Sequence, residues 1–349
     1  MRPGVLSALI AAALFGASTP FAKLLTGEMA PVLLAGLLYL GSGLGLLAWF
    51  LLRCLSKRKR STQEAALTRR DIPWLAGAIL AGGVIGPVLL MFGLARTGAA
   101  AASLLLNLEG VFTALLAWFV FRENFDRRIA FGMALIVAGG VLLSWPGESG
   151  GVSLAALAIA GACLAWAIDN NLTRKVSAAD PVQIAGLKGL IAGLVNTGIA
   201  FGLGYGFPSA SVTIAAGIVG SLGYGLSLVL FVLALRHLGS ARTGAYFSTA
   251  PFIGAALSLA LLRETPELFF WIAAGFMAAG VWLHLTERHA HQHGHEPLAH
   301  THAHVHDEHH RHEHDLPWGE REPHSHFHEH ARLVHSHPHY PDIHHRHRH

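Results

Sequence analysis

Ten apolar segments, each about as long as a membrane-crossing helix, occupy most of this chain of 349 residues. A helix needs about 20 residues to cross a hydrocarbon core of about 30 Å, and lipid accepts only helices or closed barrels. Hydrophobic residues make up 52% of the sequence and charged residues only 13%, which is outside the balance of soluble domains. The sequence therefore predicts an all-α membrane protein with ten transmembrane helices, at approximately residues 5–24, 31–52, 73–95, 98–121, 127–145, 152–173, 181–205, 211–235, 240–262 and 266–286.

Lys and Arg residues gather on one side of the predicted membrane. The connection after the second segment alone holds Arg53, Lys57, Arg58, Lys59, Arg60, Arg69 and Arg70, whereas the opposite side has Lys23, Arg96 and Arg263. Because Lys and Arg favour the cytoplasmic side, we expect both termini in the cytoplasm and a multi-pass protein of a bacterial inner membrane. The first segment has no convincing cleavage site, so we interpret it as a membrane helix rather than a signal peptide.

The apolar part of the sequence repeats itself. Residues 31–44 (PVLLAGLLYLGSGL) resemble residues 181–194 (PVQIAGLKGLIAGL), and residues 107–123 (NLEGVFTALLAWFVFRE) resemble residues 248–264 (STAPFIGAALSLALLRE). The first five segments therefore recur as the last five, and the expected domains are repeats at residues 1–145 and 152–286, followed by a tail at residues 287–349. Because each repeat has an odd number of spans, the second is expected to lie upside down relative to the first. Inverted repeats typically place a solute site at their interface near the bilayer midplane and alternate its access between the two sides.

Residues 1–286 resemble the drug/metabolite transporter superfamily, in particular its EamA-type members. The resemblance rests on the ten-span duplication, on the segment LFGASTPFAK at residues 14–23, and on the Arg-Glu that closes residues 107–123 and 248–264. It implies secondary active transport, commonly export of metabolites, amino acids or toxic compounds, through a cavity between the two halves. The chain departs from the family in its long tail and in Glu109-Gly110, where the second repeat has Ala250-Pro251, which is nearer the usual pattern.

Three charged residues fall inside predicted membrane helices: Glu109, Asp169 and Lys188. A charge at the centre of such a helix costs about 2.5–3.5 kcal/mol, so each requires an explanation. Their similar depth permits an ion pair between Glu109 and Lys188, which would neutralise both charges and leave Asp169, with Asn170 and Asn171, to face a cavity. These five residues are the candidate site for a cation or proton, and a purely structural ion pair is the alternative.

Two further kinds of polar residue in the helices are expected to be structural. Asn107 is expected to hydrogen-bond to a neighbouring helix. The tryptophans at 118, 145, 166 and 282 are expected at the lipid interface or in the core.

The tail is rich in histidines, and it holds all but two of the 25 in the chain. They recur as His-x-His, so that residues i and i+2 share one side of an extended chain and their imidazoles converge without any fold. Imidazole suits ions such as Ni²⁺, Co²⁺ and Zn²⁺, so we expect a disordered tail that binds a divalent transition metal. The alternatives are an affinity tag, although the longest histidine run is two residues, and a pH-sensitive tether. The candidate metal ligands are His289, His291, His293, His295, His300, His302, His304, His306, His324, His326, His328 and His330.

Together these features predict an exporter whose tail captures, buffers or senses a transition-metal ion and whose cavity moves either that ion or a metal-linked small solute, which means efflux of Ni²⁺, Co²⁺ or Zn²⁺ or metal-linked regulation. The alternatives are a metabolite, amino-acid or drug exporter with a regulatory tail, and a membrane-anchored metal store or sensor. The zinc-protease spacing HExxH is absent from the sequence, and we expect no enzyme activity and no required cofactor. The expected partners are the lipid bilayer and a small solute or metal ion, with a homodimer as an option, and no nucleic acid.

Overall fold

The computed structural model describes residues 3–55, 67, 69, 71–121, 127–144, 153–176, 180–286, 290–295, 298–304, 324–330 and 333–338. They form two compact units, one that holds the helices and one that holds the tail, and each is described by itself. The first repeat contains α1 (Pro3–Leu25), α2 (Pro31–Leu55), α3 (Ile72–Ala78), the π-helix η1 (Ile79–Ile85), α4 (Gly86–Arg96), α5 (Ala99–Leu105), α6 (Leu108–Phe121) and α7 (Arg127–Ser144). The second contains α8 (Leu154–Val176), α9 (Pro181–Gly202), α10 (Ala210–Gly220), the π-helix η2 (Ser221–Leu226), α11 (Ser227–Phe247), α12 (Ala250–Leu262) and α13 (Leu268–Leu285). The strands of the tail are β1 (Ala290–His295), β2 (Leu298–His304), β3 (His324–His330) and β4 (Leu333–Pro338).

The helical unit confirms the predicted all-α membrane fold. In the described residues, eight helical stretches are long and apolar enough to cross a membrane, and α12 and α13 are shorter apolar helices. The third predicted segment is one continuous stretch formed by α3, η1 and α4, whereas the fourth is broken between α5 and α6. Large apolar side chains such as Leu154, Leu194 and Phe119 are exposed on the surface of the unit, as expected where lipid rather than water surrounds a protein.

The chain reverses direction inside α11, although helical geometry continues from Ser227 to Phe247. The ring centroids of Phe231 and Phe247 lie 4.8 Å apart. In a straight helix these residues would be separated by about 24 Å. The eighth and ninth predicted segments are therefore connected within α11, and the non-helical break falls later than expected, at Ser248 and Thr249.

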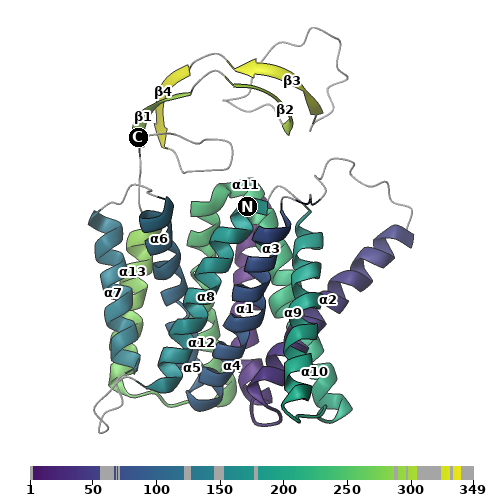
Figure 1. The fold of residues 1–349 in the computed structure, drawn as a ribbon. Coiled ribbons are helices and arrows are strands. Elements are labelled where there is room, and N and C mark those ends of the chain that lie inside the picture. The colour runs from purple at the N-terminus through teal and green to yellow at the C-terminus, as the bar shows by residue number, and fades with distance from the viewer. Residues whose placement is uncertain are drawn as a thin grey trace. The chain divides into compact units, whose positions relative to one another are not determined.

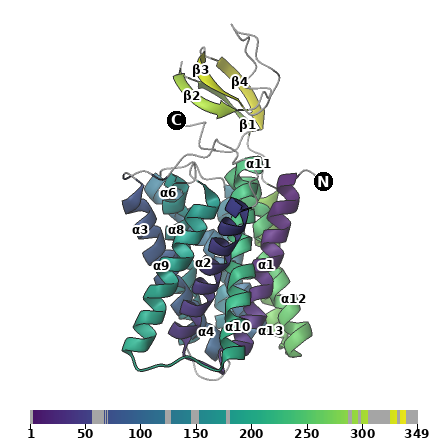
Figure 2. The same ribbon diagram turned by 90° about the vertical axis from the view of Figure 1, so that its right-hand side faces the viewer.

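The two repeats run in opposite directions across the bundle (Figures 1 and 2). Near the end of α1, Lys23 donates a hydrogen bond to the carbonyl of Leu94 near the end of α4, at 2.7 Å. The start of α8 lies beside the same part of α4, because Leu154 and Phe92 line one pocket. Thus α8 starts where α1 finishes. We name this side of the bundle the Lys23 end, and the opposite side, where Asp180 caps the start of α9, the Asp180 end.

Both repeats carry the same two irregularities. A π-helix interrupts the third helix of each, as η1 in the first repeat and η2 in the second. The fourth helix of each is broken, at Leu106-Asn107 and at Ser248-Thr249. Short π-helical turns and broken membrane helices are common at functional sites, because they leave backbone groups available for side chains or solutes.

Helices α2 and α9 pack closely along the centre of the unit. A Cβ atom on Gly189 would lie 2.8 Å from the Cα of Gly43, so a side chain at this position is excluded. Small residues let membrane helices approach until their backbones touch, which compensates for the weak hydrophobic driving force in lipid. This contact joins the two repeats, since α2 belongs to the first and α9 to the second.

The described residues of the tail include four short strands. Strand β1 pairs with β4, and β2 pairs with β3, both antiparallel. The alternating His-x-His pattern is compatible with these strands, because a period of two is also the pattern of a β-strand. His289 and His306 lie outside the described residues, and the other ten candidate metal ligands lie on β1, β2 and β3.

Candidate functional site

The break in the fourth helix places Glu109 in the first turn of α6. Its backbone N–H donates to the carbonyl of Leu106 across the break, at 3.1 Å. In the second repeat the equivalent helix, α12, starts with Ala250 and Pro251, both of which are buried. Only the first repeat therefore has a carboxylate at this point.

Glu109 is bound by an amide of the other repeat. The side-chain Nδ2 of Asn170 on α8 donates to Glu109 Oε1 at 2.8 Å. Glu109 and Asn170 are both partly exposed, and Gly110 next to them is exposed. This contact bridges the two repeats where α6 and α8 lie side by side.

Asp169, adjacent to Asn170 in the chain, is engaged differently. Lys188 on α9 donates to both of its carboxylate oxygens, at 2.6 and 2.7 Å, and Thr173 donates to Oδ1 at 2.8 Å. Both members of the pair are buried, with side-chain exposures of 6% for Lys188 and 9% for Asp169. The expected ion pair between Glu109 and Lys188 is therefore wrong, because Lys188 pairs with Asp169 instead.

Gly82 in η1 explains why Asp169 reaches Lys188. The carboxylate of Asp169 packs directly against Gly82, where a Cβ atom would collide with it. Helices α8 and α9 both contact η1, and the side chain of Asp169 passes the glycine to reach α9. The ion pair between Asp169 and Lys188 thus depends on a glycine in the π-helix η1.

The backbone of η1 also collects hydrogen bonds from three neighbouring helices. The carbonyl of Gly82 accepts from the Tyr39 hydroxyl at 2.7 Å and from Trp166 Nε1 at 2.9 Å. The carbonyl of Gly83 accepts from Asn196 Nδ2 at 3.0 Å. The sequence analysis did not identify Tyr39 and Asn196 as part of this arrangement. The Gly82-Gly83 pair is the sequence signal that could have pointed to it.

A cluster of aromatic rings lies between the repeats. The ring of Phe15 on α1 has its centroid 5.9 Å from Trp166, 5.8 Å from Tyr224 and 5.4 Å from Phe247. Trp166 and Tyr224 are buried, whereas Phe15 and Phe247 are only partly buried. We name these four residues the aromatic cluster.

The remaining polar candidates have structural partners. Asn171 donates to the carbonyl of Ala167 on its own helix, at 2.8 Å, so the structure does not bring it to Glu109. Asn107 donates to the carbonyl of Leu104 at 2.9 Å and contacts the sulfur of Met277 on α13 at 3.9 Å, as the sequence predicts.

The Lys23 end is closed by contacts between loops and helix ends. Lys23 donates to the carbonyls of Leu94 and Thr97, at 2.7 and 2.9 Å. Glu264 accepts from the backbone N–H groups of Ala99 and Ala100 at the start of α5, at 2.7 and 3.0 Å. The Arg-Glu ending of the second repeat thereby supplies a cap for a helix of the first, and its counterpart Arg122-Glu123 lies outside the described residues.

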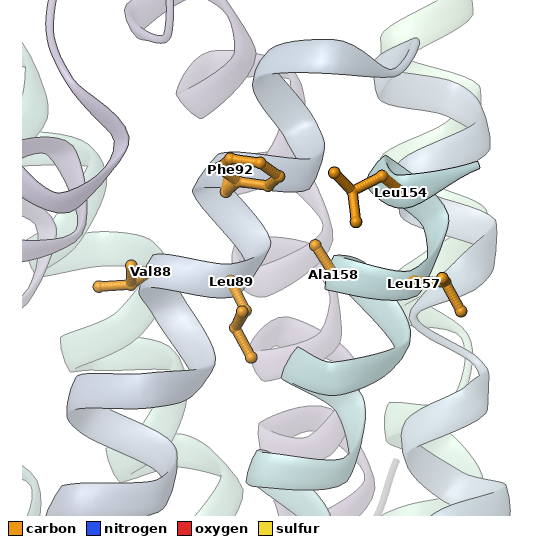
Figure 3. Close-up of a pocket in the computed structure, with 6 residues that line it drawn as sticks. All are labelled: Val88, Leu89, Phe92, Leu154, Leu157 and Ala158. Atoms are coloured by element: carbon orange, nitrogen blue, oxygen red, sulfur yellow. The ribbon is translucent and has the colours of Figure 1, made fainter.

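A pocket of about 380 Å³ lies between α4 and α8 towards the Lys23 end (Figure 3). Its lining is apolar and consists of Val88, Leu89, Phe92, Leu154, Leu157 and Ala158. It contains none of the charged residues described above, so it offers nothing to orient a polar solute.

In the tail, the strand register places histidines opposite one another. His291 faces His337 and His293 faces His335 in the β1–β4 pair. His300, His302 and His304 face His328, His326 and His324 in the β2–β3 pair.

Comparison with known proteins agrees with this architecture. The model of the EamA-like transporter family matches residues 2–145 and 153–286. An uncharacterized transporter of Methanothermobacter thermautotrophicus is 30% identical over 296 residues, which are 80% of this chain and 85% of the relative. A probable 4-amino-4-deoxy-L-arabinose-phosphoundecaprenol flippase subunit, ArnE, of Pseudomonas fluorescens is 39% identical over 85 residues, which are 24% of this chain and 74% of the relative. A solved crystal structure with 19% identity covers 79% of this chain and 94% of its own, with a TM-score of 0.57, and shares the fold.

The ten-segment inverted duplication, with broken helices and buried charges at its centre, defines a multi-pass membrane transporter. The chain belongs to the EamA-like transporter family, and the resemblance noted in its sequence is confirmed.

Proposed function

We propose that the protein is a secondary active exporter in which Glu109 binds the transported solute or the coupling proton. The observation that carries this proposal is the charge balance of the site. Asp169 is neutralised by Lys188, whereas the partner found for Glu109 in the described residues is the neutral amide of Asn170. A carboxylate inside a membrane protein is costly without a cation, so Glu109 favours the arrival of a proton or a cationic solute.

The proposal of export is supported by the end of the bundle from which Glu109 is accessible. Glu109, Asn170 and Gly110 keep exposed surface. On the other side of the break, Gly16 packs against the backbone of Ala250 and Gly254, leaving no space even for a Cβ atom. This arrangement suits a state in which a solute enters from the Asp180 end. Because the distribution of Lys and Arg predicts that this end faces the cytoplasm, solute would load inside and leave outside.

We further propose that the histidine-rich tail binds a divalent transition metal, such as Ni²⁺, Co²⁺ or Zn²⁺, and links transport to its concentration. Imidazole is a good ligand for these ions. In the part of the chain whose side chains are described, no three His, Cys, Asp or Glu side chains are grouped to hold a metal. Regulation of transport by the tail and efflux of the metal itself are the two forms of this proposal.

Resistance assays in cells test the role of Glu109. Cells that express the full chain or Glu109→Gln are challenged with Ni²⁺, Co²⁺, Zn²⁺, organic cations and amino-acid analogues, and uptake is measured for each compound that the full chain protects against. We expect protection and reduced accumulation to be lost in Glu109→Gln but kept in Glu28→Gln, which alters an exposed carboxylate outside the helices. Equal protection by Glu109→Gln and the full chain would contradict the proposed role.

Deletion of residues 289–349 tests the role of the tail. Regulation predicts that transport of the protected compound persists but no longer responds to added Ni²⁺ or Zn²⁺. Metal efflux predicts instead a rise in cellular metal content. Metal binding without any transport by the full chain would point to a membrane-anchored metal store.

A further inference from the structure

We propose that the solute is an organic cation that binds between Glu109 and the aromatic cluster of Phe15, Trp166, Tyr224 and Phe247, with its positive charge against the carboxylate and the ring faces. This inference rests on the proposed function, since it names the class of solute for the same site. It is carried by the position of the aromatic rings, by the direction of the indole nitrogen of Trp166 and by the net charge of the site.

One face of α8 brings the aromatic cluster close to Glu109. Cys163, Trp166 and Asn170 are spaced by three and four residues, so they lie on one face of the helix. The Cys163 thiol contacts the carbonyl of Leu105 at 3.7 Å, on one side of the break, and Asn170 donates to Glu109 on the other side, at 2.8 Å. Trp166 lies between these two contacts and therefore faces the break at which Glu109 begins α6.

The indole nitrogen of Trp166 is bonded outside the cluster, because Nε1 donates to the carbonyl of Gly82 in η1. The hydroxyl of Tyr39, which has its ring centroid 5.5 Å from that of Tyr224, donates to the same carbonyl. Trp166 thus presents its ring to Phe15 rather than its hydrogen-bonding group. Aromatic faces attract cations through their quadrupole, most strongly where water is excluded.

The rings come from both repeats, as a site at their interface requires. Phe15 lies on α1 in the first repeat, and Trp166, Tyr224 and Phe247 lie on α8, η2 and α11 in the second. Phe15 and Phe247 keep part of their surface exposed, so the cluster is not a sealed core. Rocking of one repeat against the other would separate these rings and open the space between them.

The charge of the site selects the sign of the solute. Lys188 is committed to Asp169, so the Glu109, Asp169 and Lys188 group carries one net negative charge when Glu109 is ionised. A cation restores neutrality, whereas an anion would add a second unbalanced charge in a medium of low dielectric constant. Because Ala250 stands at the position equivalent to Glu109, we expect one cation per chain.

Two probe ions of nearly the same shape and opposite charge test this inference. Binding of tetraphenylphosphonium and of tetraphenylborate to the purified full chain in detergent is measured by calorimetry, with detergent alone as the blank. We expect one tetraphenylphosphonium per chain and no saturable binding of tetraphenylborate. Glu109→Gln should abolish saturable binding, and Glu109→Asp should retain weakened binding, which separates loss of charge from loss of folding.

The aromatic contribution is tested at Phe15, which is partly exposed. Phe15→Leu should weaken tetraphenylphosphonium binding by about 3-fold to 30-fold, the effect expected for a lost cation–π contact. Phe269→Leu, on the exposed surface of α13, is the matched control and should leave binding unchanged. Equal binding of both probe ions, or no effect of Phe15→Leu, would overturn the assignment of the solute class. The assignment would also fail if tetraphenylphosphonium did not bind while transport still required Glu109, and in that case the proposed function would remain.

Discussion

Asp169 on α8 and Lys188 on α9 form a buried ion pair that passes beside Gly82 of η1, a residue that has no side chain to obstruct it. The pair joins two helices of the second repeat through the third helix of the first. It also leaves Glu109 as the carboxylate that has only an amide partner among the described residues. The position of Lys188 therefore determines which of the two carboxylates is neutralised and which has an amide as its partner.

Removing one member of this pair should destabilise the protein strongly. Asp169→Asn leaves a buried ammonium group without its counter-charge, which costs about 3–5 kcal/mol for buried pairs. The double variant Asp169→Asn with Lys188→Met should recover most of this loss, because no charge is then left unpaired. Thermal unfolding in detergent, followed by size-exclusion chromatography of the surviving protein, measures the difference, with Glu28→Gln as a control. The ion pair has no such role if the single and double variants unfold at the same temperature.

The same packing predicts the effect of a single methyl group. Gly82→Ala places a Cβ atom against the carboxylate of Asp169, so the side chain must move and its contact with Lys188 must be lost or distorted. We expect a loss of thermal stability similar to that of Asp169→Asn. Gly198→Ala on α9 is the matched control, since no atom lies within 4 Å of the added Cβ. An unchanged melting temperature for Gly82→Ala would show that η1 yields to accommodate the methyl group.

Sequence reasoning found the membrane segments and the duplication because length, apolar composition and repetition are properties of the chain itself. It identified Glu109, Asp169 and Lys188 as residues that require an explanation, because charge in lipid is costly wherever it occurs. It assigned the wrong partner to Lys188, since depth along a helix can be counted whereas rotation about the helix axis cannot. That rotation turns Asp169 towards η1 and Asn170 towards Glu109, and it depends on Gly82 in a distant segment. The π-helices and the aromatic cluster were missed for the same reason, because both arise from packing between the repeats.

Glu264 should hold the Lys23 end closed. Its carboxylate accepts hydrogen bonds from Ala99 and Ala100 at the positive end of α5, a cap that contributes about 1 kcal/mol in typical helices. Glu264→Ala should therefore open this end more often and expose Ser103, which is fully buried on α5. The measurement is the rate at which a membrane-impermeant maleimide labels Ser103→Cys in cells, relative to the same protein without that cysteine.

We expect labelling of Ser103→Cys to become several-fold faster with Glu264→Ala. Glu267→Ala is the control, because Glu267 is exposed and makes no side-chain cap at the start of α13. Labelling that is equally slow in both variants would mean that contacts other than Glu264 close this end.

Metal binding by the tail should depend on which histidines are removed and not only on how many. In an antiparallel pair, directly opposed residues share a face with Cβ atoms about 4.5–5.5 Å apart, and alternate residues of a strand share that face as well. The register pairs His291 with His337 and His293 with His335. Replacing these four by Gln should weaken Ni²⁺ binding to the full chain, measured by calorimetry, more than replacing His309, His310, His312 and His314, which belong to the part of the tail that the structure does not describe. Equal losses of Ni²⁺ binding would show that affinity depends only on the number of histidines, because every imidazole is equally available in a chain without defined strand pairing.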